Sequence, residues 1–135
     1  MNSDVKENEL VISDYYDLLN LHKALVEVKF LDNPNNRCIA GSPIIARISN
    51  RIVELLTVLD KRNGREKLWI DWRKITNHDY YKDRIIKLIA EIETGWKAYD
   101  DERKRNVVLN YSAPFICSEA DINQILRSVE EKING

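Results

Sequence analysis

Apolar residues recur every three or four positions along most of the chain, the spacing that places side chains on one face of a helix. These stripes predict helices over 14–30, 43–62, 65–75 and 78–94, then a helix through Tyr111 and a C-terminal helix through Ile133. No run of alternating apolar and polar residues between hairpin turns argues for a strand. We therefore expect an all-α fold, a single helical domain over 1–135 built as a bundle of four to six helices, with 1–12 as a flexible lead-in.

Capping and turn-forming residues mark the ends of these helices. Ser42-Pro43 predicts a helix start, because the hydroxyl can accept from a free backbone N–H and proline lacks the N–H that would stay unpaired. Asn63-Gly64 predicts a left-handed stop. Ser118–Asp121 resembles a capping box, and Ser13 is the expected cap of the first helix. Gly95 leaves open how far the preceding helix extends.

The centres of the apolar stripes predict the core of the bundle. Side chains at these positions face neighbouring helices and leave water on folding. The residues expected to be buried are Ile48, Ile52, Leu55, Leu59, Ile85, Leu88, Ile92 and Leu126. Truncation of one of them to alanine should cost about 2–5 kcal/mol.

Charge is nearly balanced overall but unevenly placed. The formal net charge is −1, and a basic middle, 61–110, lies between acidic ends, 1–60 and 111–135. The favoured interpretation is that helices of opposite sign pair within the fold, and the alternative is a basic surface for an acidic partner. No secretory signal and no apolar stretch of membrane-spanning length is present, so we expect a cytosolic protein without a membrane partner.

The residues that usually carry catalysis or metal binding are scarce. The chain has two histidines, two cysteines and four glycines, with no glycine-rich phosphate loop and no nucleophile motif. The histidines and cysteines form no close pair in sequence, as zinc sites usually do. We therefore expect no metal site and no cofactor, and we assign no catalytic residue.

Arg73 and His78 have the spacing R-x4-H. This spacing resembles the motif of the HEPN ribonucleases, small all-α bundles in which such an Arg and His from two subunits meet over the scissile phosphate. The resemblance implies a metal-independent ribonuclease in which the Arg73 guanidinium holds the phosphate and the His78 imidazole acts in proton transfer.

The densest mixture of aromatic and basic residues lies between positions 65 and 84. Two tryptophans share a helix face at i, i+3, and Trp, Tyr and Arg are common at the centres of protein interfaces. The two indoles either pack in the core or anchor a partner, and we expect at least one to be partly exposed. The candidate partner-binding residues are Trp69, Trp72, Arg73, Lys74, Tyr80, Lys82 and Arg84.

Together these patterns predict a non-enzymatic protein that binds another protein. One concrete form is an inhibitor or immunity-type protein of a bacterial toxin system, an analogy at the level of protein class. The alternatives are the HEPN-like ribonuclease and a structural subunit that forms a helical homodimer. Nucleic acid is less favoured as a partner, because the net charge is close to neutral.

Overall fold

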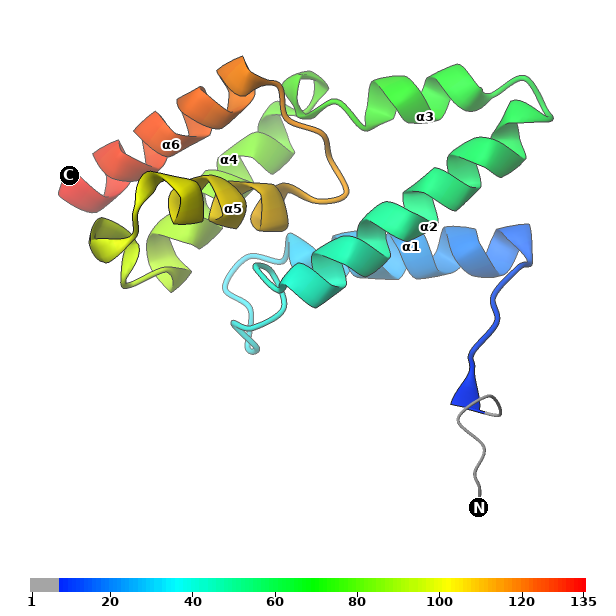
Figure 1. Ribbon diagram of the computed structural model, residues 1–135, viewed down its shortest axis with the longest axis horizontal. Helices are drawn as coiled ribbons and strands as arrows, with labels where there is room; N and C mark the ends of the chain where they lie inside the picture. Colours follow the sequence, from blue (N-terminus) through cyan, green and yellow to red (C-terminus); the bar gives the residue numbers. More distant parts are fainter. Residues whose placement is uncertain (1–7) are drawn as a thin grey trace.

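The computed structural model describes residues 8–135, which form six α-helices and no β-strand (Figure 1). The helices are α1 (Tyr15–Lys29), α2 (Pro43–Lys61), α3 (Glu66–Trp72), α4 (Asp79–Ile92), α5 (Asp101–Ser112) and α6 (Glu119–Asn134). Two 3₁₀ turns, η2 (Ile75–Asn77) and η3 (Trp96–Ala98), precede and follow α4. The all-α prediction and the expected number of helices are confirmed for this part of the chain. Residues 1–7 of the expected lead-in lie outside the described residues, and 9–12 have no regular structure.

Three predicted helix ends are confirmed by local geometry. The Ser42 hydroxyl accepts the Ile45 N–H at 3.2 Å at the start of α2. Gly64 follows α2 with φ of 71°, a left-handed conformation that costs glycine little. A capping box formed by Ser118 and Asp121 starts α6. Local hydrogen-bonding chemistry was sufficient to place these ends.

Two other predicted ends were displaced. Asp14 caps α1 instead of Ser13, because its carboxylate accepts the N–H groups of both Tyr16 and Asp17. α4 ends at Ile92 and does not reach Gly95.

The expected helix 65–75 is also shorter than its apolar pattern suggests, since α3 stops at Trp72. The backbone beyond it pairs with the segment that precedes α6. Ile116 N–H donates to the Arg73 carbonyl, and Ile75 N–H donates to the Ile116 carbonyl. This single parallel bridge replaces a further helical turn.

The six helices form two halves that differ in how they close. In the C-terminal half, α4, α5 and α6 each pack against the other two. In the N-terminal half, α2 packs against both α1 and α3, but α1 and α3 make no extensive contact (Figure 1). The N-terminal half is therefore open between α1 and α3.

The predicted core was correct in part. Ile52, Ile85 and Leu88 are buried. Ile48, in contrast, is 40% exposed, so the expectation that it is buried was wrong. Four others, Leu55, Leu59, Ile92 and Leu126, are only half-buried. The errors concentrate on α2, whose pattern is apolar around much of its circumference although only part of it meets other helices.

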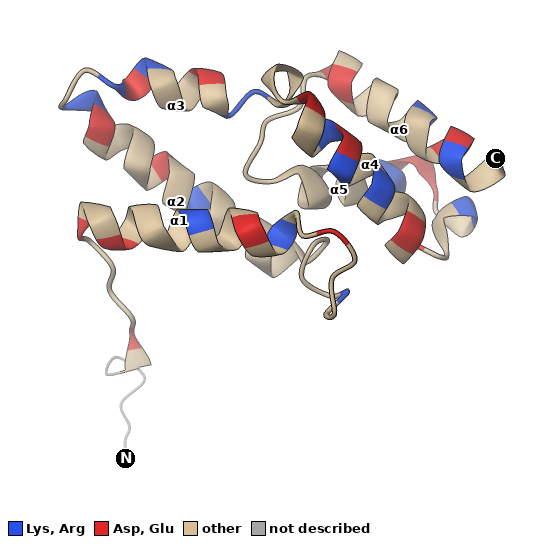
Figure 2. Ribbon diagram, turned by 180° about the vertical axis from the view of Figure 1, so that it is seen from behind, with Lys and Arg blue, Asp and Glu red and all other residues tan. Residues whose placement is uncertain are grey.

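The basic middle of the sequence pairs with its acidic ends. Within residues 8–135 there are nine ion pairs, and six join 61–110 to one of the flanking segments. Lys82–Asp121 and Lys104–Glu130, for example, join α4 and α5 to α6. Figure 2 shows positive and negative positions interleaved along α3 and α4. The interpretation of the charge asymmetry as internal pairing is confirmed.

Candidate functional site

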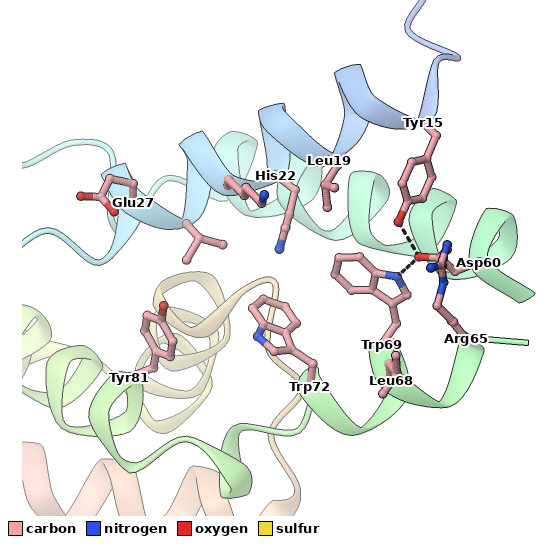
Figure 3. Close-up of a pocket in the computed structure, with 12 residues that line it drawn as sticks. Tyr15, Leu19, His22, Glu27, Asp60, Arg65, Leu68, Trp69, Trp72 and Tyr81 are labelled. Atoms are coloured by element: carbon pink, nitrogen blue, oxygen red, sulfur yellow. Dashed lines mark hydrogen bonds and ion pairs between the residues drawn. The ribbon is translucent and has the colours of Figure 1, made fainter. Parts of the chain in front are cut away.

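A cavity of about 590 Å³ occupies the opening between α1 and α3 (Figure 3). It is lined by Tyr15, Leu19, His22, Lys23, Val26 and Glu27 of α1, Asp60 of α2, Arg65, Leu68, Trp69 and Trp72 in and just before α3, and Tyr81 of α4. We call this site the aromatic cleft. Its volume lies within the range of roughly 300–1,000 Å³ that is typical of ligand pockets.

A buried carboxylate closes one end of the aromatic cleft. Asp60, only 3% exposed, accepts hydrogen bonds from the Tyr15 hydroxyl at 2.9 Å and from Trp69 Nε1 at 2.6 Å. Arg65 Nη2 lies 3.1 Å from the same carboxylate. Burial alone would raise the pKa of Asp60, but these hydrogen bonds and the Arg65 charge outweigh burial and lower it. The charged Asp60 carboxylate, near the end of α2, therefore connects Tyr15 of α1 and Trp69 of α3.

His22 forms the α1 wall beside the two indoles. Its ring centroid lies 5.2 Å from that of Trp69 and 4.9 Å from that of Trp72, and both contacts are edge-to-face. His22 is 7% exposed, and burial, with a smaller effect of the Lys23 charge, lowers its pKa to about 4. The imidazole is consequently neutral at pH 7, with one N–H donor and one acceptor nitrogen.

The opposite wall is an aromatic cluster that reaches into the C-terminal half. Trp72 packs on Phe115 with ring centroids 4.6 Å apart, and Tyr81 packs on the other side of the cluster at 5.0 Å from Phe115. The His78 ring lies within this cluster and hydrogen bonds to the Trp72 carbonyl. These contacts orient Trp72 and Tyr81 toward the cleft from rigid elements.

The structure separates the candidate partner-binding residues into three groups. Trp69 and Trp72 line the aromatic cleft, and both are half-buried, so the expectation that at least one indole is partly exposed is confirmed. Lys74 and Tyr80 are exposed outside the cleft. The other three candidates, Arg73, Lys82 and Arg84, bind other residues of the fold.

The contacts of Lys82 and Arg84 lie within the fold. Lys82 Nζ lies 3.3 Å from an Asp121 carboxylate oxygen on α6, with the Lys82 side chain only 11% exposed. Arg84 donates to the Phe30 carbonyl and places its guanidinium over the Tyr80 ring. The candidate residues therefore do not form one continuous basic face.

Arg73 and His78 have separate partners. The Arg73 guanidinium donates to the Pro114 carbonyl and to the Asn50 side chain, and lies 3.9 Å from Glu54. The His78 ring bonds to the Trp72 carbonyl. Within residues 8–135 no hydrogen bond joins the two side chains, and each is committed to holding the fold together.

Several residues of the cleft were not singled out from the sequence. Tyr15 and His22 belong to the apolar stripe of α1, and Tyr81 belongs to that of α4, so the sequence pattern alone indicates packing residues at these three positions. Asp60 carries no signal in the sequence, because a lone acid near a helix end is usually solvated. One sequence signal points to the cleft: His22 is a polar residue in the centre of an otherwise apolar stripe.

Other kinds of site receive no support from the described residues. Among residues 8–135, no group of three His, Cys, Asp or Glu side chains is placed to hold a metal ion. Cys38 is exposed and Cys117 is half-buried, and both are free thiols. No helix in the described part of the chain combines the length and hydropathy needed to cross a bilayer. No protein-family model, curated protein or solved structure matches the chain.

Proposed function

We propose that this chain is a non-catalytic cytosolic protein that binds another protein through the aromatic cleft and the adjacent exposed side of α3. The observation that carries the proposal is the cleft itself: two half-exposed indoles face a buried, neutral histidine in an open cavity. Aromatic side chains held rigidly at a surface opening are the usual anchors of protein interfaces.

The exposed apolar residues are concentrated in the N-terminal half of the molecule, which also contains the aromatic cleft. Within residues 8–135, thirteen large hydrophobic side chains are exposed, and ten of them lie between positions 10 and 70. Leu68, which lines the cleft, and Ile70, also on α3, are 66% and 45% exposed. An apolar surface of this kind usually marks an interaction site.

Charge favours a protein over a nucleic acid as the partner. Nucleic-acid binding relies on cations that are free to neutralise phosphates. Arg73 and Lys82 instead form ion pairs with Glu54 and Asp121. An inhibitor or immunity-type protein of a bacterial toxin system remains our example of such a binder, by analogy of class alone.

A homodimer is the second candidate. α2 exposes Ile44, Ile48 and Val58, at 57%, 40% and 57%. A second copy of the chain could cover this face in a two-fold arrangement. The ribonuclease alternative has less support, because Arg73 and His78 are engaged separately within the fold.

Site-specific photo-crosslinking in cells tests the proposal. A benzophenone amino acid at Leu68 should give one discrete crosslinked protein, whereas the same group at Leu109, an exposed leucine of α5, should give none. Trp72→Ala should weaken the Leu68 product. A product at twice the chain mass would indicate the homodimer, and equal labelling from both positions would contradict the proposal. Hydrolysis of RNA that is lost in Arg73→Ala would instead support the ribonuclease.

A further inference from the structure

α2 has an outer apolar face that the fold leaves uncovered. On its inner face, Ile52 and Leu56 are buried in the cluster between α1 and α2. Ile44, Ile48 and Val58 lie on the outer face and are exposed. None of these three side chains lines the aromatic cleft. The outer face is therefore a second apolar surface, separate from the cleft, and apolar surfaces of this kind usually mark an interaction site.

The spacing of the outer face is that of a seam between two paired helices. Steps of four and three residues alternate along it, which keeps the side chains on one line of the helix. The positions on this line are Ile44, Ile48, Arg51, Leu55 and Val58. Arg51 is exposed, and its guanidinium lies 4.0 Å from Glu54, so the aliphatic part of its side chain can pack while the charge stays in water. The seam favours a helix as its occupant.

Two opposite charges flank this seam on the same side. Arg47 and Glu54 are seven positions apart, which is two helical turns, and both are exposed. Within residues 8–135, Arg47 takes part in none of the nine ion pairs. The two ion pairs of Glu54, with Arg51 and Arg73, are long at 4.0 and 3.9 Å. Both flanking charges are therefore available to a group across an interface.

A second copy of α2 supplies those groups when the two helices run antiparallel. In the alignment that places Ile48 of each copy against Arg51 of the other, Arg47 of each copy meets Glu54 of the other. Two-fold symmetry forms this ion pair twice. The outer face is thus complementary in charge to a second copy of itself.

Other alignments of the two helices lack this complementarity. A shift by seven residues in one direction opposes Glu54 to Glu54, and a shift in the other direction opposes Arg47 to Arg47. In a parallel pair, the flanking charges would face the opposite edge of the other seam, where Ile52 is covered by its own fold. The charges therefore select one antiparallel alignment.

We propose that the outer face of α2 is a homodimer interface, in which α2 pairs antiparallel with α2 of a second copy and Arg47 of each chain forms an ion pair with Glu54 of the other. The inference gives the second candidate of the proposed function a specific contact and does not depend on the aromatic cleft. Crosslinking from Leu68 tests the cleft separately, so failure of the dimer and failure of partner binding are distinguishable.

Sedimentation equilibrium of the purified chain tests the dimer. We expect a dissociation constant in the micromolar range, because a contact centred on two helices of 19 residues is small. Ile48→Glu places a carboxylate in the seam twice and should raise the dissociation constant by about a hundredfold. Ile70→Glu on α3 makes the same change at a side chain that is 45% exposed, and should leave the dissociation constant unchanged.

Exchange of the flanking charges tests the alignment. Arg47→Glu and Glu54→Arg each create two pairs of like charges and should each raise the dissociation constant by about tenfold or more. An equimolar mixture of the two variants should dimerise as tightly as the parent, because a mixed dimer contains two pairs of opposite charge. Arg127→Glu, the same charge change on the exposed side of α6, is the control and should have no effect.

A parent chain that stays monomeric at about 100 µM would overturn the inference. A dimer that Ile48→Glu or Arg47→Glu leaves unchanged would also overturn it, because the contact would then lie elsewhere. A mixture of folded Arg47→Glu and Glu54→Arg chains that does not dimerise would contradict the antiparallel alignment. If Glu54→Arg does not fold, the Ile48→Glu and Arg47→Glu variants decide the question.

Discussion

The two halves of the molecule bury their apolar side chains to different degrees. The core around α4, α5 and α6 contains fourteen buried hydrophobic residues, twelve of them between Ile75 and Val129 and the other two, Phe30 and Ala40, from the N-terminal part of the chain. The cluster between α1 and α2 contains only three, Leu18, Ile52 and Leu56, surrounded by partly buried neighbours. Burial of apolar area is the main favourable contribution to folding. The C-terminal half therefore supplies most of the stability, and the N-terminal half supplies the surface.

Helix arrangement explains the difference. Three helices that pack pairwise enclose a common core, as α4, α5 and α6 do. With α1 and α3 both packed on α2, their inner faces touch through the rings of His22, Trp69 and Trp72 but enclose a cavity in place of a packed core. The aromatic cleft is the space that this arrangement leaves, and the contacts of Asp60 with Tyr15 and Trp69 close one end of it.

The largest expected loss in the free energy of unfolding follows a change in the C-terminal half. Leu88→Ala in α4 removes a side chain that is 1% exposed, and should lower the free energy of unfolding by about 3–4 kcal/mol. Leu55→Ala in α2 makes the same chemical change at a half-buried position, and should cost about 1–2 kcal/mol. Urea unfolding measures both. Equal losses would contradict the division of stability between the halves.

The connection between the halves should be the next most sensitive feature. Lys29 is 1% exposed, and its Nζ donates to the Ala40 carbonyl at 2.9 Å and to the Asn110 carbonyl at 2.8 Å. Burial without a carboxylate partner lowers its pKa to about 7. Lys29→Ala leaves both carbonyls unpaired and should cost about 2 kcal/mol.

Lys23→Ala on the exposed side of α1 is the matched control for this change, and we expect it to alter the free energy of unfolding by less than about 0.5 kcal/mol. If the two alanine variants unfold at the same urea concentration, Lys29 does not connect the halves.

The same contrast explains what the sequence could predict. Ser42 and Gly64 act through their nearest neighbours, so the start of α2 and its end could be placed from a few residues. The two tryptophans were found because i, i+3 spacing alone puts them on one face. The partners of Asp60 come from α1 and α3, 45 and 9 positions away, and no local pattern records that they converge. The cleft exists because α1 and α3 pack on α2 without packing closely on each other. That arrangement is a property of the tertiary structure and leaves no local pattern in the sequence.

Acid should destabilise the N-terminal half, which contains His22, more than the C-terminal half. The unfolded chain binds a proton at His22 near the ordinary pKa of about 6.5, whereas burial lowers the folded pKa to about 4. As the pH falls from 6.5 to 4 the unfolded state gains a proton first, so the free energy of unfolding should fall by about 2 kcal/mol. Above pH 6.5 His22 has no such effect.

His22→Phe should lack this contribution, which a comparison of urea unfolding at pH 7 and pH 4.5 would reveal. Hydrogen exchange should show the loss first in the amides of α1 and α3 in the parent protein. Identical pH dependence in parent and variant would show that His22 does not couple the cleft to pH.

The smallest effect on stability should accompany the largest effect on binding. Leu68 is 66% exposed, so Leu68→Ser removes little buried area and should change the free energy of unfolding by no more than about 0.5 kcal/mol. If α3 contacts the partner, the same change should weaken partner binding by about tenfold or more, the cost of losing an apolar contact in an interface. Leu109→Ser on α5 is the control, with little expected effect on binding. A Leu68→Ser variant that retains full affinity would show that the partner does not contact this side chain, and would contradict docking on α3.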